Sequence, residues 1–354
     1  MGRSLTVFAG LLLMSFTPAD QRASVIARAK VWQPTNVSAV DFKVGPGGPK
    51  AFKSGDVVTC TYVHEKLGGK TPKFACKTDE NDQLKVKFGG DNGEVYAEIL
   101  SSRLLWALGF GADHMYPVRV VCRDCPASFN GVTRSKKESV FDPATVERKM
   151  AGEAFHPDEG WSWKELEMID ETAGGATRAE RDALKLLAVF IQHTDTKPEQ
   201  QRLLCLGESK PDHTTKGPKG PMPCAQPLMM IQDLGVTFGK ANKFNEGGTG
   251  SVNLVEWAKT PVWQDETSCI GNLHKSATGT LDDPPISEDG RRFLADLLTQ
   301  LTDQQLHDLF ESARVTLRLR DPRDVKSGFP TIEEWVAAFK QKRSQIVDRH
   351  CGTS

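Results

Sequence analysis

One stretch just past the middle of the chain places a dense group of charged residues between two apolar segments. It reads FIQHTDTKPEQQRLLCL and covers residues 190–206. The preceding TRAERDALKLLAVFIQ has apolar residues at helical spacing, and RLLCL is short and apolar, as buried strands are. Charged groups beside buried segments are costly unless they are paired or bind a ligand. The stretch therefore predicts a functional site where a helix gives way to a strand.

The composition limits the classes of function. The chain has 354 residues, 38% of them hydrophobic, and a formal net charge of -1. This length suffices for one large or two ordinary domains with a sizeable core. Proteins that bind nucleic acids usually carry a basic face, so the near-neutral balance argues against a nucleic-acid partner.

The N-terminus resembles an export signal. MGRSLTVFAGLLLMSFTPAD combines Arg3 with an apolar run and has small residues at Thr17 and Ala19. This is typical of a secretory signal peptide, here residues 1–19, that is removed on export. A membrane anchor is the alternative, but the run is short for a span and no other stretch is apolar for long enough. We expect a secreted or periplasmic protein without a stable membrane span.

Eight cysteines, an even number, agree with an oxidising compartment in which disulfides persist. Cys60 and Cys76 flank a candidate hairpin, and so do Cys205 and Cys224. Both spacings favour local disulfide pairs.

Cys122 and Cys125 form a C-x-x-C with three possible roles. A four-cysteine zinc site needs a second C-x-x-C, which the sequence lacks. A redox pair usually sits at a helix N-terminus that lowers the thiol pKa, whereas the preceding RVVC is strand-like. A structural bridge is therefore favoured over the redox and zinc alternatives.

Strand patterns come before helical patterns along the chain. Residues 20–50 are rich in Pro and Gly and suggest a linker or N-terminal arm. Residues 51–150 contain the strand-like VVTCTYV, FACKT, QLKVKFG and HMYPVRVVC, with one helical segment, GEVYAEILSSRLLWALGF. Residues 151–354 are mostly helical, with capping-box patterns beginning at Thr177, Thr302 and Thr331. This order predicts an α+β fold.

The segment HTDTKPEQ resembles the catalytic loop of protein kinases, H-R-D-x-K-P-x-N. His193, Asp195 and Lys197 match in register, and Gln200 stands in place of the Asn. Asp233 then begins an Asp-Leu-Gly after the apolar LMMIQ, which resembles the metal-binding D-F-G. In kinases one such carboxylate meets the attacking hydroxyl and the other holds Mg²⁺ against the phosphates of ATP.

Two upstream residues extend the resemblance. Lys87, on a predicted strand, precedes Glu98, on a predicted helix, and such a pair in kinases clamps the nucleotide phosphates and fixes the helix. The spacing from Glu98 to Gly109, with a strand following, is similar to HipA-type bacterial kinases and type II phosphatidylinositol kinases. Secretory-pathway kinases are a looser comparison. The resemblance covers roughly residues 55–240.

The resemblance implies a two-lobed kinase-like fold, with a β-rich N-terminal lobe at residues 51–150 and a mostly helical C-terminal lobe at 151–354. It also implies roles for single residues. Asp195 would act as the base and Lys197 would neutralise charge on the transferred group. Asp233 would bind Mg²⁺, with Gln200 as a second ligand.

The expected nucleotide-binding residues lie in the first lobe. Lys87, held by Glu98, would contact the ATP phosphates, and Gly68 and Gly69 would cover them through backbone N–H groups. These residues also have simpler explanations. Lys85 and Lys87 could be solvated residues on the surface of a strand, and His193 could have a structural role.

The sequence also departs from the kinase pattern. It has no G-x-G-x-x-G and no A-P-E after the Asp-Leu-Gly, and Gln200 is one methylene longer than Asn. Two functions therefore stay open. One is an exported phosphotransferase that uses ATP and Mg²⁺ on a protein, lipid or small-molecule hydroxyl, or that transfers the nucleotide instead. The other is a catalytically inactive pseudokinase that acts as an extracytoplasmic binding module.

Overall fold

The chain is described by a computed structural model that covers residues 18–69, 71–126, 128–129, 132–133, 139–207, 224–239 and 250–352. The predicted signal peptide falls on residues 1–19, and residues 1–17 of it lie outside the described residues. Helix α1 (Pro18–Ala27) begins where that segment was expected to end. Among the described helices, none is both long and apolar enough to cross a bilayer.

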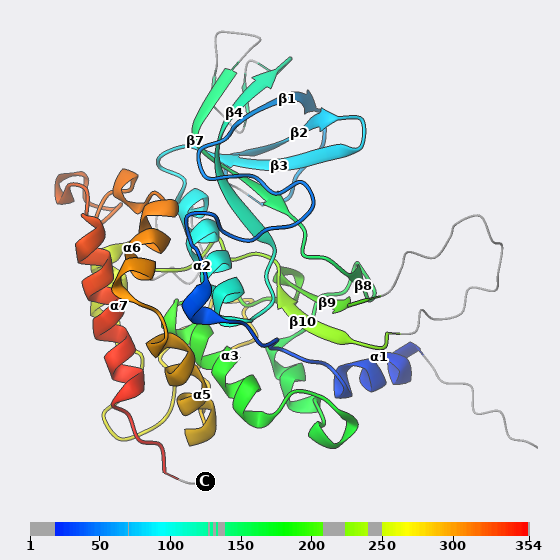
Figure 1. Ribbon diagram of the computed structural model, residues 1–354, viewed down its shortest axis with the longest axis vertical. Coiled ribbons are helices and arrows are strands. Elements are labelled where there is room, and N and C mark those ends of the chain that lie inside the picture. The colour runs from blue at the N-terminus through cyan, green and yellow to red at the C-terminus, as the bar shows by residue number, and fades with distance from the viewer. Residues whose placement is uncertain are drawn as a thin grey trace, which may run out of the picture.

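Five strands close into a barrel in the order β1-β2-β3-β7-β4 (Figure 1). They are β1 (Val57–Val63), β2 (Lys73–Asp79), β3 (Asp82–Phe88), β4 (His114–Arg123) and β7 (Ser139–Arg148). Only the β1–β4 pair is parallel. The rings of Phe74, Phe88 and Phe141 pack together inside, with centroids 4.6–5.6 Å apart. Because side chains alternate along a strand, Lys85 and Lys87 of β3 lie on the outer face.

Helix α2 (Gly93–Leu108) packs against this outer face and is buried over almost its whole length. It begins at the N-cap Asn92, whose side chain accepts a hydrogen bond from the Glu94 amide. It ends at Gly109, whose positive φ of 87° suits glycine. The predicted helix and its stop are confirmed.

A second sheet has the order β10-β9-β8, from β8 (Glu153–Ala154), β9 (Gln201–Cys205) and β10 (Pro227–Ile231). Strands β9 and β10 form the hairpin expected after the charged stretch. A two-stranded sheet pairs β5 (Ser128–Phe129) with β6 (Val132–Thr133). Short 3-10 helices lie at Val37–Ala39, Trp163–Met168, Glu171–Ala173, Pro198–Gln200, Val315–Leu317 and Val325–Ser327.

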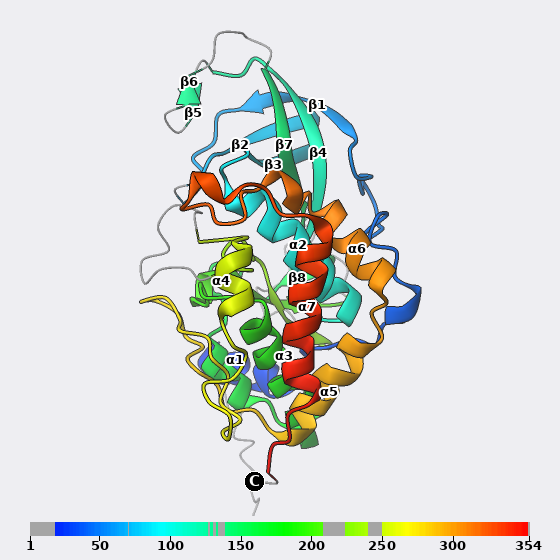
Figure 2. The same cartoon turned by 90° about the vertical axis from the view of Figure 1, so that its left-hand side faces the viewer.

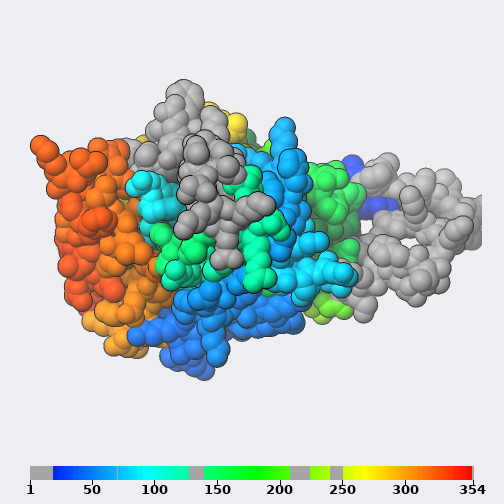
Figure 3. All heavy atoms as spheres, turned by 90° about the horizontal axis from the view of Figure 1, so that it is seen from above, coloured from blue at the N-terminus to red at the C-terminus, as the bar shows by residue number. Residues whose placement is uncertain are grey.

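The remaining helices gather at the end of the molecule away from the barrel (Figure 2). They are α3 (Arg178–Phe190), α4 (Leu254–Lys259), α5 (Glu288–Thr299), α6 (Asp303–Ser312) and α7 (Ile332–Val347). Helix α3 packs on α5, and α7 contacts α4, α5 and α6. The capping boxes at Thr177, Thr302 and Thr331 are all formed. In the view from above, the orange residues of the C-terminal part of the chain project to one side of the barrel (Figure 3), and α6 contacts α2.

The α+β class expected from the sequence is therefore confirmed. Of the two alternatives expected for residues 20–50, a linker or an N-terminal arm, the packing agrees with the arm. Val31, Val37 and Phe42 are fully buried in the main core. The Trp32 indole donates to the Leu108 carbonyl at 2.7 Å. The apolar side chains of this segment outweigh its Pro and Gly content, and it packs as an arm along the body.

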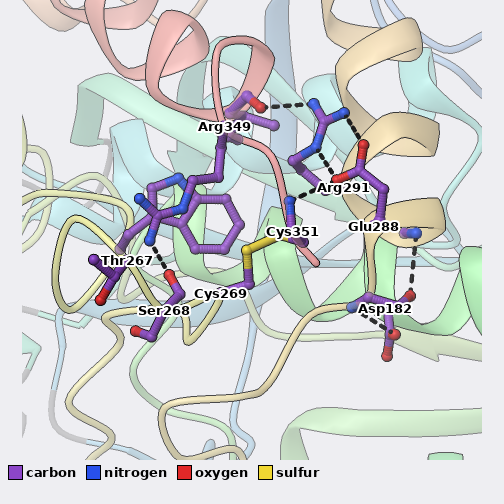
Figure 4. Close-up of a disulfide and its surroundings, with 12 residues drawn as sticks. Asp182, Thr267, Ser268, Cys269, Glu288, Arg291, Arg349 and Cys351 are labelled. Atoms are coloured by element: carbon purple, nitrogen blue, oxygen red, sulfur yellow. Dashed lines mark hydrogen bonds and ion pairs between the residues drawn. A yellow bond between two sulfur atoms is a disulfide. The ribbon is translucent and has the colours of Figure 1, made fainter. Parts of the chain in front are cut away.

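All four disulfides are formed within the described residues: Cys60–Cys76, Cys122–Cys125, Cys205–Cys224 and Cys269–Cys351. Both hairpin pairs and the structural bridge of the C-x-x-C are confirmed. The fourth joins the irregular segment before α5 to the chain end after α7 (Figure 4).

Lys342 of α7 is fully buried. Its ammonium donates to the Thr260 carbonyl at 2.5 Å and lies 5.4 Å from the centroid of the Trp257 ring. Burial lowers the pKa of Lys342 from 10.5 to about 7. The unfolded chain therefore holds this proton more tightly, so protonation destabilises the fold as the pH falls from 10.5 to 7.

We predict that Lys342→Met stabilises the protein increasingly as the pH falls over this interval. Methionine does not titrate, so the gain approaches about 4 kcal/mol at pH 7 and falls below about 1 kcal/mol at pH 10. Urea unfolding of both proteins at the two pH values measures the difference. A gain that is equal at both values would contradict the burial of a charge at this position.

Candidate functional site

Lys87 joins the barrel to α2. Its side chain is 1% exposed, and its ammonium contacts Glu98 Oε1 and lies 2.7 Å from Glu94 Oε2. Glu94 and Glu98 are one helical turn apart and so lie on one face of α2. The predicted pairing of Lys87 with Glu98 is therefore present. The sequence reasoning missed Glu94, which its four-residue spacing from Glu98 could have indicated.

The charges around Lys87 belong to three elements. Burial alone would lower the pKa of Lys87, but the carboxylates of Asp233, Glu98 and Glu94 raise it well above its ordinary value. Burial acts to raise the pKa of Glu98, and the paired ammonium of Lys87 opposes that rise. Its Oε2 has no hydrogen-bond partner among the described residues. A further charged or polar group could thus be bound here.

Asp233 follows β10 and lies beside lysines of the barrel. Burial opposes its ionisation, yet Lys87 and Lys85, with a smaller effect of Lys73, hold the pKa of Asp233 well below its usual range. Its Oδ1 accepts a hydrogen bond from the Gly235 amide at 3.0 Å. Asp233 is therefore an ionised carboxylate that faces lysine side chains of the barrel.

Gly235 allows α2 to approach this carboxylate closely. A Cβ at Gly235 would lie 2.8 Å from Glu94 Cγ, 3.0 Å from Glu94 Cδ and 3.2 Å from Asp233 Oδ1. These separations are shorter than normal van der Waals contacts with carbon. The glycine of the Asp-Leu-Gly therefore places Glu94 next to Asp233.

The HTDTKPEQ loop, residues 193–200, brings a second charged group together. Asp195 is 8% exposed, and its Oδ2 accepts a hydrogen bond from Gln200 Nε2 at 2.9 Å and lies 3.3 Å from Lys197 Nζ. Asp195 Oδ1 has no partner among the described residues. The loop thus brings Asp195 together with Lys197 and Gln200, and the Gln200 amide nitrogen is engaged with Asp195.

His193 is fully buried in the same loop. Burial lowers its pKa to about 4, so its ring is neutral near pH 7, and neither ring nitrogen has a partner among the described residues. The ring centroid lies 6.2 Å from that of Trp163. Neither nitrogen makes the hydrogen bond with a described residue that a structural histidine would make, so the structural role of His193 stays a prediction.

The loop and the Asp-Leu-Gly are joined through the backbone. The Gln200 carbonyl accepts hydrogen bonds from Gln232 N at 2.8 Å and Asp233 N at 3.2 Å. Both Asp195 and Asp233 act electrostatically on the buried His193 ring. The two predicted carboxylates therefore belong to one site.

The predicted glycine turn lies at the edge of this site. Gly69 has a φ of 81°, and a Cβ there would lie 2.7 Å from Lys73 Nζ, so its backbone passes over that ammonium. A Cβ at Gly68 would meet nothing within 4 Å. Just beyond the turn, Thr71 Oγ1 donates to Glu94 Oε2 at 2.9 Å. The turn is thereby tied to α2.

The donor set fits a hard divalent cation, which prefers oxygen ligands. Asp233 supplies an ionised carboxylate. Gln200 supplies an amide oxygen that accepts no hydrogen bond from the described residues. The unpartnered oxygens of Glu98 and Asp195 show that the polar groups of this site are not saturated by one another.

Comparisons with known proteins identify no family. No family model matches the sequence, and no curated protein matches it. Among solved structures, the chain is similar to a Helicobacter pylori proinflammatory kinase, CtkA, at 11% identity and a TM-score of 0.42. The match covers 83% of this chain and 96% of that chain. At this level the similarity assigns neither a family nor an activity.

We predict that Gly235→Ala destabilises the protein by about 1–3 kcal/mol, as overpacking does, because the new methyl group displaces Glu94 from Lys87 and Thr71. Glu94→Ala provides the matched background, since it removes the atoms that the methyl group would meet. Urea unfolding of the two single variants and the double variant measures the coupling. Equal costs of Gly235→Ala in both backgrounds would show that Glu94 does not occupy this position.

Proposed function

We propose that this protein is a kinase-like phosphotransferase that uses ATP and Mg²⁺ to phosphorylate a hydroxyl group. The observation that carries the proposal is the buried Lys87, held between two carboxylates of α2 and facing the ionised Asp233. A lysine, a helix glutamate and a metal-binding aspartate are the parts that position phosphates in kinase-type transfer. Their order along strand, helix and hairpin supports the same assignment.

The barrel side of the site suits binding of the nucleotide. Lys73, Lys85 and Lys87 present positive charge toward Asp233, and anionic phosphates would be stabilised there. Gly68 and Gly69 would cover the phosphates with backbone N–H groups. Asp233 would hold the magnesium ion, with Gln200 as its second ligand. The ion would supply electrostatic stabilisation of the transferred group.

The loop side suits activation of the acceptor. Asp195 has one oxygen held by Lys197 and Gln200 and one that is unpartnered among the described residues. The second oxygen would accept the proton of the attacking hydroxyl. Lys197 would then offset the negative charge that develops on the transferred group. The acceptor is a protein, lipid or small-molecule hydroxyl. Transfer of the nucleotide would use the same residues.

A specific contact favours a second function, that of a catalytically inactive binding module. Gln200 Nε2 donates to Asp195 Oδ2, so one oxygen of the carboxylate that would act as base is already engaged. In this pseudokinase alternative the protein would bind a nucleotide or a partner without transfer.

We also propose that the protein acts outside the cytoplasm, secreted or in a periplasm. Four disulfides among the described residues support this location, because such bonds persist in oxidising compartments. The predicted signal peptide is consistent with it.

We predict that ATP with Mg²⁺ stabilises the protein against thermal unfolding, by about 2.7 kcal/mol at a ligand concentration 100 times Kd. Asp233→Asn should remove the magnesium-dependent part of this stabilisation. Asp195→Ala should retain it and reduce phosphoryl transfer about 100-fold or more, as loss of a general base does. Asp158→Asn changes an exposed carboxylate outside the site and serves as control.

The outcomes separate the two functions. Stabilisation by the nucleotide without transfer to any acceptor supports the binding module. No stabilisation by any nucleotide, in a protein with an intact fold, would overturn both the enzyme and the nucleotide-binding assignment.

A further inference from the structure

An irregular segment, residues 272–281, lies along the HTDTKPEQ loop and is bonded to it on both sides of its aspartate. Ser276 N donates to the Thr194 carbonyl at 2.9 Å. Thr280 donates twice to the Thr196 carbonyl, from its amide at 3.1 Å and from its hydroxyl at 2.8 Å. The segment therefore holds the two neighbours of Asp195.

The contact at Thr196 is extensive. Thr196 Oγ1 accepts hydrogen bonds from Thr280 N and Leu281 N, both at 3.1 Å. The Thr280 hydroxyl also accepts one from Trp163 N at 3.1 Å. A Cβ at Gly279 would lie 2.7 Å from Thr196 Oγ1, so the two backbones approach as closely as a glycine permits. Thr280 thus links the loop to a 3-10 helix on its other side.

These bonds fix the direction in which Asp195 points. Thr196 faces the segment and is fully buried, whereas Asp195 contacts Lys197 on the side of the site. A shift of Thr194 and Thr196 would therefore turn the carboxylate of Asp195 away from its partners.

The segment contains no helix or strand, and hydrogen bonds and buried side chains, among them Leu273 and Leu281, hold it. Between α4 and α5 the described chain has only isolated β-bridges, at Trp263–Gly271 and Ile270–Pro285. The Cys269–Cys351 disulfide fastens the chain just before this segment to the chain that follows α7 (Figure 4). Beside the disulfide, the Arg349 guanidinium donates to the carbonyls of Asp265, at 2.9 Å, and of Ser268.

We propose that Thr280 is a positioning residue for Asp195 and that the Cys269–Cys351 disulfide holds Thr280 in place, so that the site is completed only in the oxidised protein. Two electrons and two protons from a dithiol would convert the disulfide to two thiols and release the segment. The dithiol would become a disulfide. This inference rests on the proposed function, because it concerns regulation of the same site.

The test compares Thr280→Val, which removes the hydroxyl, with Thr280→Ser, which keeps it. Amide hydrogen exchange at residues 276, 280 and 281 should accelerate about tenfold in the valine variant, the effect of a lost hydrogen bond, and stay near wild type in the serine variant. The kcat for phosphoryl transfer should fall about tenfold in Thr280→Val and recover in Thr280→Ser, while the Kd for ATP with Mg²⁺ is unchanged.

The disulfide is tested with the paired variant Cys269→Ala/Cys351→Ala. It should reproduce the faster exchange at residues 276–281, whereas Cys60→Ala/Cys76→Ala, which opens a disulfide of the barrel, should leave exchange there at the wild-type rate. Unchanged exchange in both Thr280→Val and the Cys269 pair would overturn the inference, and so would faster exchange with an unchanged kcat. A wild-type protein that neither binds nor turns over ATP would instead refute the proposed function, and the exchange rates would still report on the coupling.

Discussion

The buried ion pair of Lys87 with Glu98 is the interaction on which the rest of the site depends. Removing two charges from water is costly, and the cost is offset only by close pairing and further partners. Glu94 and Asp233 provide those partners. Each must lie close to the Lys87 ammonium for the pairing to form. The outer face of β3, one face of α2 and the end of β10 are therefore fixed relative to one another by a single ammonium group.

A second set of constraints brings the HTDTKPEQ loop to the same place. The Gln200 carbonyl accepts hydrogen bonds from the amides of Gln232 and Asp233, which join the loop to the Asp-Leu-Gly. The β9–β10 hairpin beneath them is closed by Cys205–Cys224. On the other side, residues 272–281 hold the loop through Thr194 and Thr196. The buried Lys87–Glu98 pair and the HTDTKPEQ loop thus face the same site, which contains the carboxylates of Asp195 and Asp233.

Local patterns in the sequence predicted much of this arrangement. Alternation in QLKVKF placed Lys87 opposite the apolar residues of β3, and the α2 helix was evident from its apolar spacing and Gly109. Other features depend on contacts between distant segments. Residues 20–50 have a loop-like composition but bury Val31 and Phe42 against the core. The bond from Gln200 to Asp195 depends on how the loop folds back, which spacing alone does not reveal.

We propose that Lys87 and Asp233 form the phosphate and metal side of a nucleotide site. A crystal structure of the protein with Mg²⁺ and a non-hydrolysable ATP analogue would test this assignment. We expect phosphate oxygens against the Lys87 ammonium, the metal ion on Asp233, and the terminal phosphate facing Asp195. A nucleotide bound elsewhere on the molecule, or a metal ion that Asp233 does not contact, would contradict it.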